Sequence, residues 1–181
     1  MDNPAPRDII AFWEEAGPKL WFTQDPAFDG RVRWEFFGAH QSAAYGGLDG
    51  WASNAGGALA LILLLDQFPR NIFRGLARAF GTDGKALGVA KGAIARGFDA
   101  AWEVPVKRFF YLPAMHSEDV RDQDFCLEKC AAAGDEEGVK FARIHRDIIA
   151  RFGRFPHRNA LLGRQTTLEE QAFLDAGGFA G

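Results

Sequence analysis

The chain has 181 residues, a formal net charge of −3 and an apolar content of 48%, which includes 17 Phe and 5 Trp. A chain of this length can bury one core without splitting, so we predict a single helical domain over residues 1–181. The apolar content excludes an intrinsically disordered chain. The mildly acidic balance lacks any dense run of Lys and Arg, so we expect no nucleic-acid partner.

The N-terminal stretch Met1–Ile10 carries Asp2 and Asp8 and lacks both the basic and the apolar region of a signal peptide. The longest uncharged apolar run, Ala55–Leu65, is about half of the ~20 residues that cross a bilayer. We therefore predict a cytoplasmic protein with no membrane partner.

The two cysteines, Cys126 and Cys130, are four residues apart in a helical pattern. Side chains at this spacing lie ~5–6 Å apart at Cβ, whereas a disulfide requires ~3.5–4.5 Å. We therefore predict reduced thiols, as in a cytosolic protein, and the spacing matches no common zinc motif.

The first clearly marked helix begins at Asp25-Pro26, an N-cap followed by Pro at the first helical position, and it runs to about Ala44. Its apolar residues, which include Phe28, Val32 and Phe36, share one face. Trp34 and Phe37 lie on roughly the opposite face. We therefore expect this helix to pack on two sides.

The next helix is capped by Asn54, is apolar all round up to Leu65, and should form the middle of the core. Further helices are predicted over residues 83–96, 117–133 and 136–152, and a last one starts at a capping box opened by Thr167. No segment alternates with period two over a strand length, so we predict an all-α fold with no sheet.

A first group of candidate ligand-binding residues follows the most apolar helix, and its members are Asp66, Gln67, Arg70, Asn71 and Arg74. We expect Asp66 to end that helix, and its carboxylate must be paired if it is buried. The segment Phe68-Pro69-Arg70-Asn71 is echoed by Phe155-Pro156-His157-Arg158-Asn159. The two copies are interpreted either as equivalent corners of a helical stack or as two Pro-started turns without common ancestry.

The second copy supplies further candidates, namely Arg158, Asn159 and Arg164. Arg70 and Arg158 would each lie in the first turn of a Pro-started helix, where positive charge opposes the helix dipole. A negative group is therefore expected beside them. Two alternatives stay open: an internal carboxylate in a structural ion-pair network, or a bound phosphate or carboxylate.

Three histidines and one acid are candidates for proton transfer, namely His116, Glu118, His145 and His157. The structural alternative for Glu118 is a place in the first turn of a helix with Ser117 as N-cap, which leaves His116 unexplained. His145 falls within an apolar helical stripe, so it is either a core histidine satisfied by one hydrogen bond or a functional group.

No metal site and no particular cofactor are predicted. The histidines lack a compact metal-binding motif such as His-Glu-x-x-His. There is also no Gly-x-Ser-x-Gly elbow for a nucleophile and no glycine-rich loop of a nucleotide-binding type. The sequence therefore leaves open whether the protein is an enzyme.

Several long blocks of the sequence are distinctive, and they lie at Phe12-Trp13, Lys19–Phe22, Asp25–Asp29, Leu65–Asn71, Phe109–Pro113, His116–Asp119 and Arg151–Asn159. Together they resemble the bacterial family numbered 924 among the domains of unknown function, over nearly the whole chain. The resemblance implies a right-handed helical array, an α-α superhelix similar to tetratricopeptide-like folds. It implies no reaction and carries over no catalytic residues.

Two functional hypotheses follow. The first is a binding or enzymatic pocket for a small anionic molecule, lined by Arg, His and acidic residues at corners between helices. The alternative is a helical-repeat module that binds a partner protein or peptide on a concave surface.

Overall fold

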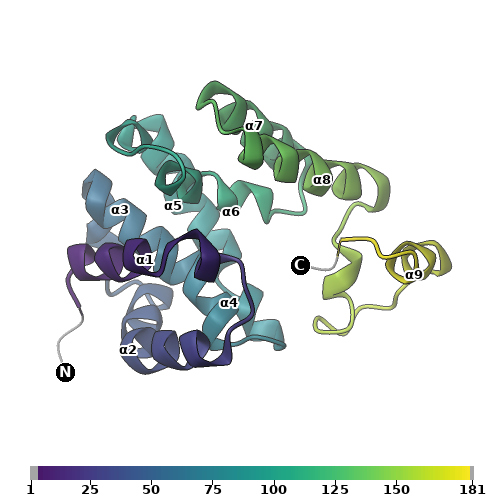
Figure 1. Ribbon diagram of the computed structural model, residues 1–181, viewed down its shortest axis with the longest axis horizontal. Helices are drawn as coiled ribbons and strands as arrows, with labels where there is room; N and C mark the ends of the chain where they lie inside the picture. The colour runs from purple at the N-terminus through teal and green to yellow at the C-terminus, as the bar shows by residue number, and fades with distance from the viewer. Residues whose placement is uncertain (1–3, 180–181) are drawn as a thin grey trace. The chain divides into compact units, whose positions relative to one another are not determined.

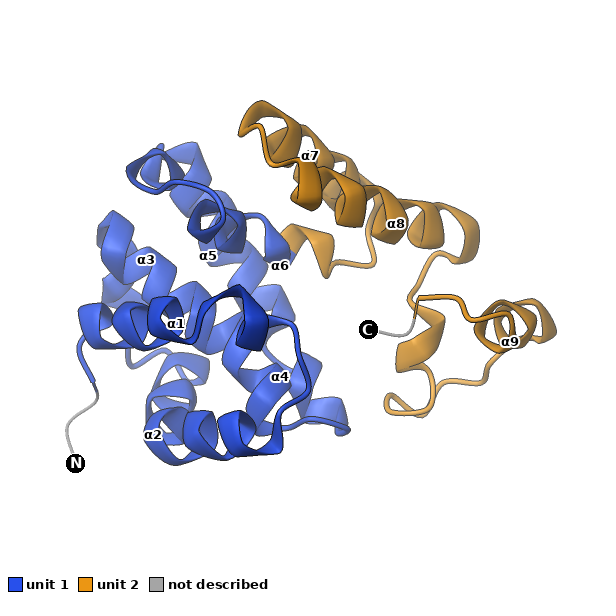
Figure 2. Ribbon diagram, viewed as in Figure 1, with its two compact units in different colours: residues 1–113 blue, residues 114–181 orange. Residues whose placement is uncertain are grey.

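A computed structural model describes residues 4–179 of the chain (Figure 1). The chain forms two compact units, Met1–Pro113 and Ala114–Gly181, and the division falls within one short helix (Figure 2). Residues 1–3, part of the stretch that lacks signal-peptide features, lie outside the described residues, as do residues 180–181. The single domain over residues 1–181 stays a prediction.

All regular structure in residues 4–179 is helical, so the predicted all-α class without sheet is confirmed. The right-handed array stays a prediction. None of the helices described is both long and apolar enough to cross a membrane. The helices are α1 (Pro6–Trp21), α2 (Pro26–Ala44), α3 (Ala55–Ile62), α4 (Phe68–Ile72), α5 (Asp83–Ala95), α6 (Leu112–Met115), α7 (Val120–Ala132), α8 (Glu136–Phe152) and α9 (Leu168–Asp175).

In the first unit α3 is the central element, since α1 and α5 both pack against it, while α2 packs on α4. Aromatic rings fill the space between these helices, with the rings of Phe12 and Phe36 4.7 Å apart and those of Trp13 and Phe68 5.4 Å apart. In the second unit α7 and α8 lie side by side (Figure 1).

Three predicted helix starts are confirmed. Asp25 accepts hydrogen bonds from the amides of Ala27 and Phe28 at the start of α2, and Asn54 accepts one from Gly57 at the start of α3. Thr167 and Glu170 form the expected capping box of α9.

The predicted start of the helix at Ser117 is wrong. The helix α7 begins at Val120, and its N-cap is Asp119, whose carboxylate accepts a hydrogen bond from the Arg121 amide. Ser117 instead donates from Oγ to Oδ2 of Asp122 at 2.7 Å. Asp is as good an N-cap as Ser, so local preference did not distinguish the two positions.

The predicted two-sided packing of α2 is also wrong for Trp34, whose side chain is 90% exposed. Only the face that carries Phe28, Val32 and Phe36 is buried. Phe37 retains a partial contact through its ring, which lies 6.1 Å from that of Phe73.

The apolar helix does not end at Asp66. The helical backbone continues from α3 through a π-helical turn, Leu63–Gln67, directly into α4. Asp66 lies within that turn and is fully buried. Arg70 therefore lies in the last turn of a long helix instead of the first turn of a new one, and there a positive charge is favoured by the helix dipole.

The π turn has a chemical cause at Pro69, which has no amide hydrogen to donate to the carbonyl of Leu65. The amide of Phe68 bonds to Leu63, so the carbonyl of Leu64 also lacks its usual helical partner. Side chains from elsewhere supply both bonds: Nδ1 of His40 contacts the Leu64 oxygen at 2.8 Å, and Oγ1 of Thr82 donates to the Leu65 oxygen at 2.6 Å.

We predict that Thr82→Val lowers the free energy of unfolding by about 1–3 kcal/mol, because the change keeps the shape and leaves a buried carbonyl without a donor. Urea unfolding measures the loss. Thr23→Val is the matched control, since the Thr23 hydroxyl also donates to a backbone carbonyl, that of Lys19, but at an exposed position. Equal losses in the two variants would contradict this account of the π turn.

Candidate functional site

The first group of predicted residues forms an internal ion-pair network in the first unit. Both terminal nitrogens of Arg70 donate to the Asp83 carboxylate at 3.1 Å, and Nη1 also lies 3.4 Å from Asp66. Gln67 donates to Asp66 as well. The Arg70 guanidinium therefore lies between two carboxylates.

The neighbouring Arg74 and Asn71 converge on Asp29, a residue that the sequence analysis missed. Arg74 donates to Asp29 from Nε at 2.6 Å and from Nη2 at 2.8 Å, and Asn71 donates at 2.8 Å. Partial burial would raise the pKa of Asp29, but these hydrogen bonds hold it below its ordinary value. Because each cation here has a carboxylate partner, we do not place a ligand site in this group.

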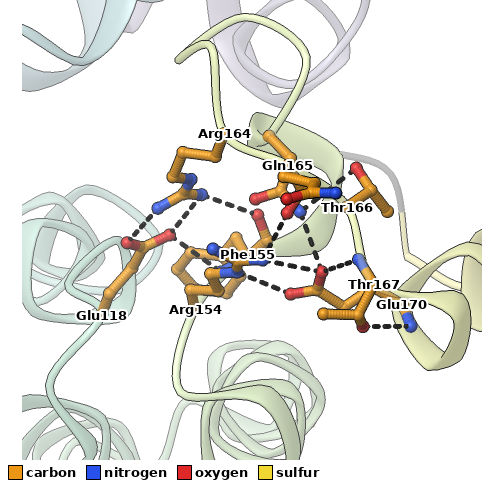
Figure 3. Close-up of polar contacts among 9 residues, drawn as sticks. Glu118, Arg154, Phe155, Arg164, Gln165, Thr166, Thr167 and Glu170 are labelled. Atoms are coloured by element: carbon orange, nitrogen blue, oxygen red, sulfur yellow. Dashed lines mark hydrogen bonds and ion pairs between the residues drawn. The ribbon is translucent and has the colours of Figure 1, made fainter.

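In the second unit the Glu118 carboxylate anchors the loop after α8 through hydrogen bonds (Figure 3). It accepts two hydrogen bonds from the Arg164 guanidinium, at 2.7 and 3.0 Å, and one from the Phe155 amide at 2.8 Å. Burial would raise the pKa of Glu118, but these donors lower it. Glu118 is therefore an anchored carboxylate at neutral pH and has no proton to donate.

A second carboxylate, that of Glu170, lies across Arg154 and Phe155 from Glu118 (Figure 3). It accepts hydrogen bonds from Arg154 at 2.6 and 2.8 Å, from the Thr167 amide at 2.8 Å and from Asn159 at 3.2 Å. The Arg154 hydrogen bond is the main reason why the pKa of Glu170 is lowered to about 2. Glu170 was predicted only as part of the capping box opened by Thr167, and Arg154 was not among the predicted site residues.

The three predicted histidines come together around Phe155 in the second unit. The rings of His145 and His157 each lie 5.5 Å from the Phe155 ring, and His116 lies 6.5 Å from His145. His145 is buried, as its place in the apolar stripe predicted, and its Nδ1 contacts the Phe141 carbonyl at 2.8 Å.

His157 lies in a positive environment. Burial and the charge of Arg158, followed by Arg164 and His116, lower the pKa of His157 to about 4, and Glu118 opposes them. The His157 ring is therefore neutral at pH 7. Its Nδ1 is buried and finds no hydrogen-bond partner in the part of the chain that the structure describes, and the same holds for Nε of Arg164.

Arg158 lies against the same ring system. Its guanidinium carbon is 4.4 Å from the centre of the Phe155 ring, and Nη1 donates to the His116 carbonyl at 3.0 Å. Arg158 and Asn159 are both buried, in or directly after a three-residue 3-10 helix that starts at Pro156. The structure thus brings together all the candidates from the second half of the chain.

The two echoed segments are not equivalent corners. Phe68–Ile72 is the end of a continuous helix, whereas Pro156–Arg158 forms a short 3-10 helix in a loop. The shared Pro therefore serves different local structures in the two places.

Across residues 4–179, no three His, Cys, Asp or Glu side chains are placed so that they could hold a metal ion. Cys126 and Cys130 are free and buried, with their sulfur atoms 4.0 Å apart, so the prediction of reduced thiols is confirmed. The hydrogen bond between the two thiols, together with burial, raises the pKa of Cys126 far above its ordinary value. This makes a nucleophilic role for Cys126 unfavourable.

Comparison with known proteins decides the family. The model of a family of bacterial proteins of unknown function, DUF924, matches residues 9–178. The chain belongs to the DUF924 family. It is similar to the solved structure of a protein of unknown function, ATU0120, from Agrobacterium tumefaciens, with a TM-score of 0.92 and 47% identity over 95% of this chain and 97% of that chain.

A comparison with curated proteins gave no match. Membership of DUF924 therefore supports the fold but indicates no activity. The function of this DUF924 protein has to be argued from its own residues.

Proposed function

We propose that this DUF924 protein binds a small anionic molecule, a carboxylate or a phosphate, in its second unit. The site is the histidine corner, which we define as His116, Glu118, His145, His157, Arg158, Asn159 and Arg164. The observation that carries the proposal is the buried Nδ1 of His157, which has no partner among the described residues and lies among positive charges.

Charge and hydrogen bonding support an anion at this place. Arg158, Arg164 and His116 all disfavour a proton on His157, and an anion would offset their field. A ligand oxygen would accept a hydrogen bond from Nδ1 of His157 or from Nε of Arg164. A buried donor without a partner costs about 1–3 kcal/mol. A ligand that supplies the missing acceptor therefore gains affinity.

The roles within the histidine corner differ. Glu118 accepts hydrogen bonds from Arg164 and the Phe155 amide, so it positions these two groups. Neutral His157 would donate a hydrogen bond to the ligand, and Arg158 would supply charge. We assign binding to this site and no reaction.

The test is a titration calorimetry and thermal-shift experiment with inorganic phosphate, acetate and citrate. We expect at least one of them to raise the melting temperature, since a ligand at 100 times its Kd stabilises the folded state by about 2.7 kcal/mol. His157→Phe, which keeps a ring and removes both nitrogens, should abolish the effect. Arg146→Gln, which removes an exposed cation paired with Asp124, should retain it. A flat response of the wild-type protein to all three anions would refute the proposal.

A second candidate function, binding of a partner protein, is favoured by the outer face of α2. Trp34 and Tyr45 are 90% and 86% exposed, and they lie about three helical turns apart on the same side. Aromatic residues of this kind are enriched at protein interfaces. Comparison of Trp34→Ala with the wild type in a pulldown from bacterial lysate tests this candidate, and a pulldown without a specific partner would count against it.

We place the protein in the cytoplasm as part of the same proposal. The support is the free state of both cysteines, which is typical of a reducing compartment.

A further inference from the structure

The chain turns back sharply after α9. Gly177 has a φ of +78°, which a residue with a side chain rarely adopts, and the Gly178 amide donates to the Phe173 carbonyl at 3.0 Å. A Cβ atom on Gly178 would lie 2.5 Å from the Phe173 ring. Two glycines are therefore required for the turn that brings Phe179 back toward the histidine corner.

Phe179 lies on the histidine corner itself. Its ring centre is 4.5 Å from that of His145 and 5.7 Å from that of His157. It also packs against the small apolar cluster of Ile148, Ile149 and Phe155. The ring is only partly buried, and a single turn of chain holds it in place.

We infer that the ligand of the histidine corner carries an aromatic ring beside its anionic group, and that Phe179 occupies the position of that ring. This inference rests on the proposed function, because it names the class of ligand for the same site. It also makes the segment Gly177–Phe179 a competitor that the ligand must displace.

The surroundings of Phe179 are those that an aromatic ring prefers. The planes of His157 and Phe179 are inclined by 76°, close to the edge-to-face arrangement favoured between aromatic rings, and those of His145 and Phe179 are tilted by 59°. Arg158 belongs to the same ring cluster, as does Nδ1 of His157, which has no partner among residues 4–179. A ligand ring in the place of Phe179 would therefore have donors for an acidic group within the same site.

The experiment compares ligands with and without a ring. 3-Phenylpropionate and phenyl phosphate are titrated by calorimetry into the wild type and Phe179→Ala, alongside propionate and inorganic phosphate. We expect Phe179→Ala to lower the Kd of at least one aromatic anion by tenfold or more, since a buried ring contributes about that factor. The Kd of the anions without a ring should change by less than about twofold in the same comparison. Comparison of the Kd values of the two aromatic ligands shows whether the site prefers a carboxylate or a phosphate as the anionic group.

Three further variants serve as controls. Phe179→Leu retains apolar packing in the turn and should show a smaller gain, and it replaces Phe179→Ala if circular dichroism shows that the alanine variant is unfolded. Phe141→Ala removes a more exposed ring of α8 and should show no gain. The gain should disappear when His157→Phe is added to Phe179→Ala.

The outcomes separate the two proposals. If propionate or phosphate binds the wild type, but aromatic anions gain nothing in Phe179→Ala or Phe179→Leu, the aromatic class is wrong and the anion site stands. If neither propionate nor inorganic phosphate binds the wild type, the anion site is refuted, and the inference about the aromatic class, which rests on it, fails as well. A gain that persists in the double variant with His157→Phe would also overturn the inference, because the ring would then bind elsewhere.

Discussion

Arg70→Met is expected to lower the free energy of unfolding by about 3–5 kcal/mol, the cost of leaving a buried charge without its partner. The carboxylate of Asp66 is fully buried, and the Arg70 guanidinium is the cation within 3.4 Å of it. Arg70 also donates to the backbone carbonyl of Asp66 and to Asp83, so the substitution removes several bonds at once. Urea unfolding followed by circular dichroism measures the change.

Two control variants test whether the stability loss of Arg70→Met comes from the buried ion pair. Arg7→Met removes a strongly exposed cation next to Asp8 and should cost less than about 1 kcal/mol. The double variant Asp66→Asn with Arg70→Met removes both charges and should regain part of the stability. If the Arg70 variant is as stable as the Arg7 variant, the network does not hold the first unit together.

Glu170→Gln is expected to lower the free energy of unfolding by about 3 kcal/mol at pH 7, because Arg154 and Asn159 lose a buried carboxylate. Glu169→Gln is the neighbouring control. Its carboxylate is exposed and paired with Arg151, so the cost should stay below about 1 kcal/mol. Equal effects of the two substitutions would contradict the role given to Glu170.

The contributions of Glu170 and His157 to the free energy of unfolding depend on pH. The pKa of Glu170 is about 2 in the folded protein against an ordinary 4.5, so its stabilisation is complete above pH 4.5 and is lost as the pH falls toward 2. The pKa of His157 is about 4 against an ordinary 6.5, so the unfolded chain takes up its proton first and stability falls between pH 6.5 and 4. Unfolding curves across these ranges should show a smaller slope below pH 4.5 in Glu170→Gln and above pH 4 in His157→Phe.

The elements that could be predicted from the sequence depend on neighbours in the chain. A cap directly precedes its helix and accepts hydrogen bonds from amides two or three residues further on, so Asp25, Asn54 and Thr167 were identified from local pattern. The burial of His145 followed from the period of its own helix. The general composition of the candidate site was predicted in the same way, as a set of Arg, His and acidic residues after apolar helices.

The rest depends on contacts between distant segments. Nothing near Trp34 in the sequence indicates that its side chain stays 90% exposed while Phe37, on the same face of α2, contacts Phe73. The partner of Arg74 is Asp29, 45 residues away, and the partner of Arg164 is Glu118, 46 residues away. A sequence shows which side chains need a partner, but only the packing of helices decides which partner each one finds.

The π turn has a consequence for how the first unit acquires its structure. Its two displaced carbonyls are completed by His40 and Thr82, which lie 24 and 17 residues away along the chain. The segment Leu63–Gln67 cannot satisfy its own backbone before the chain around His40 and Thr82 has docked on it. The most apolar helix of the protein therefore forms cooperatively with its neighbours, so local and tertiary structure arise there in one step.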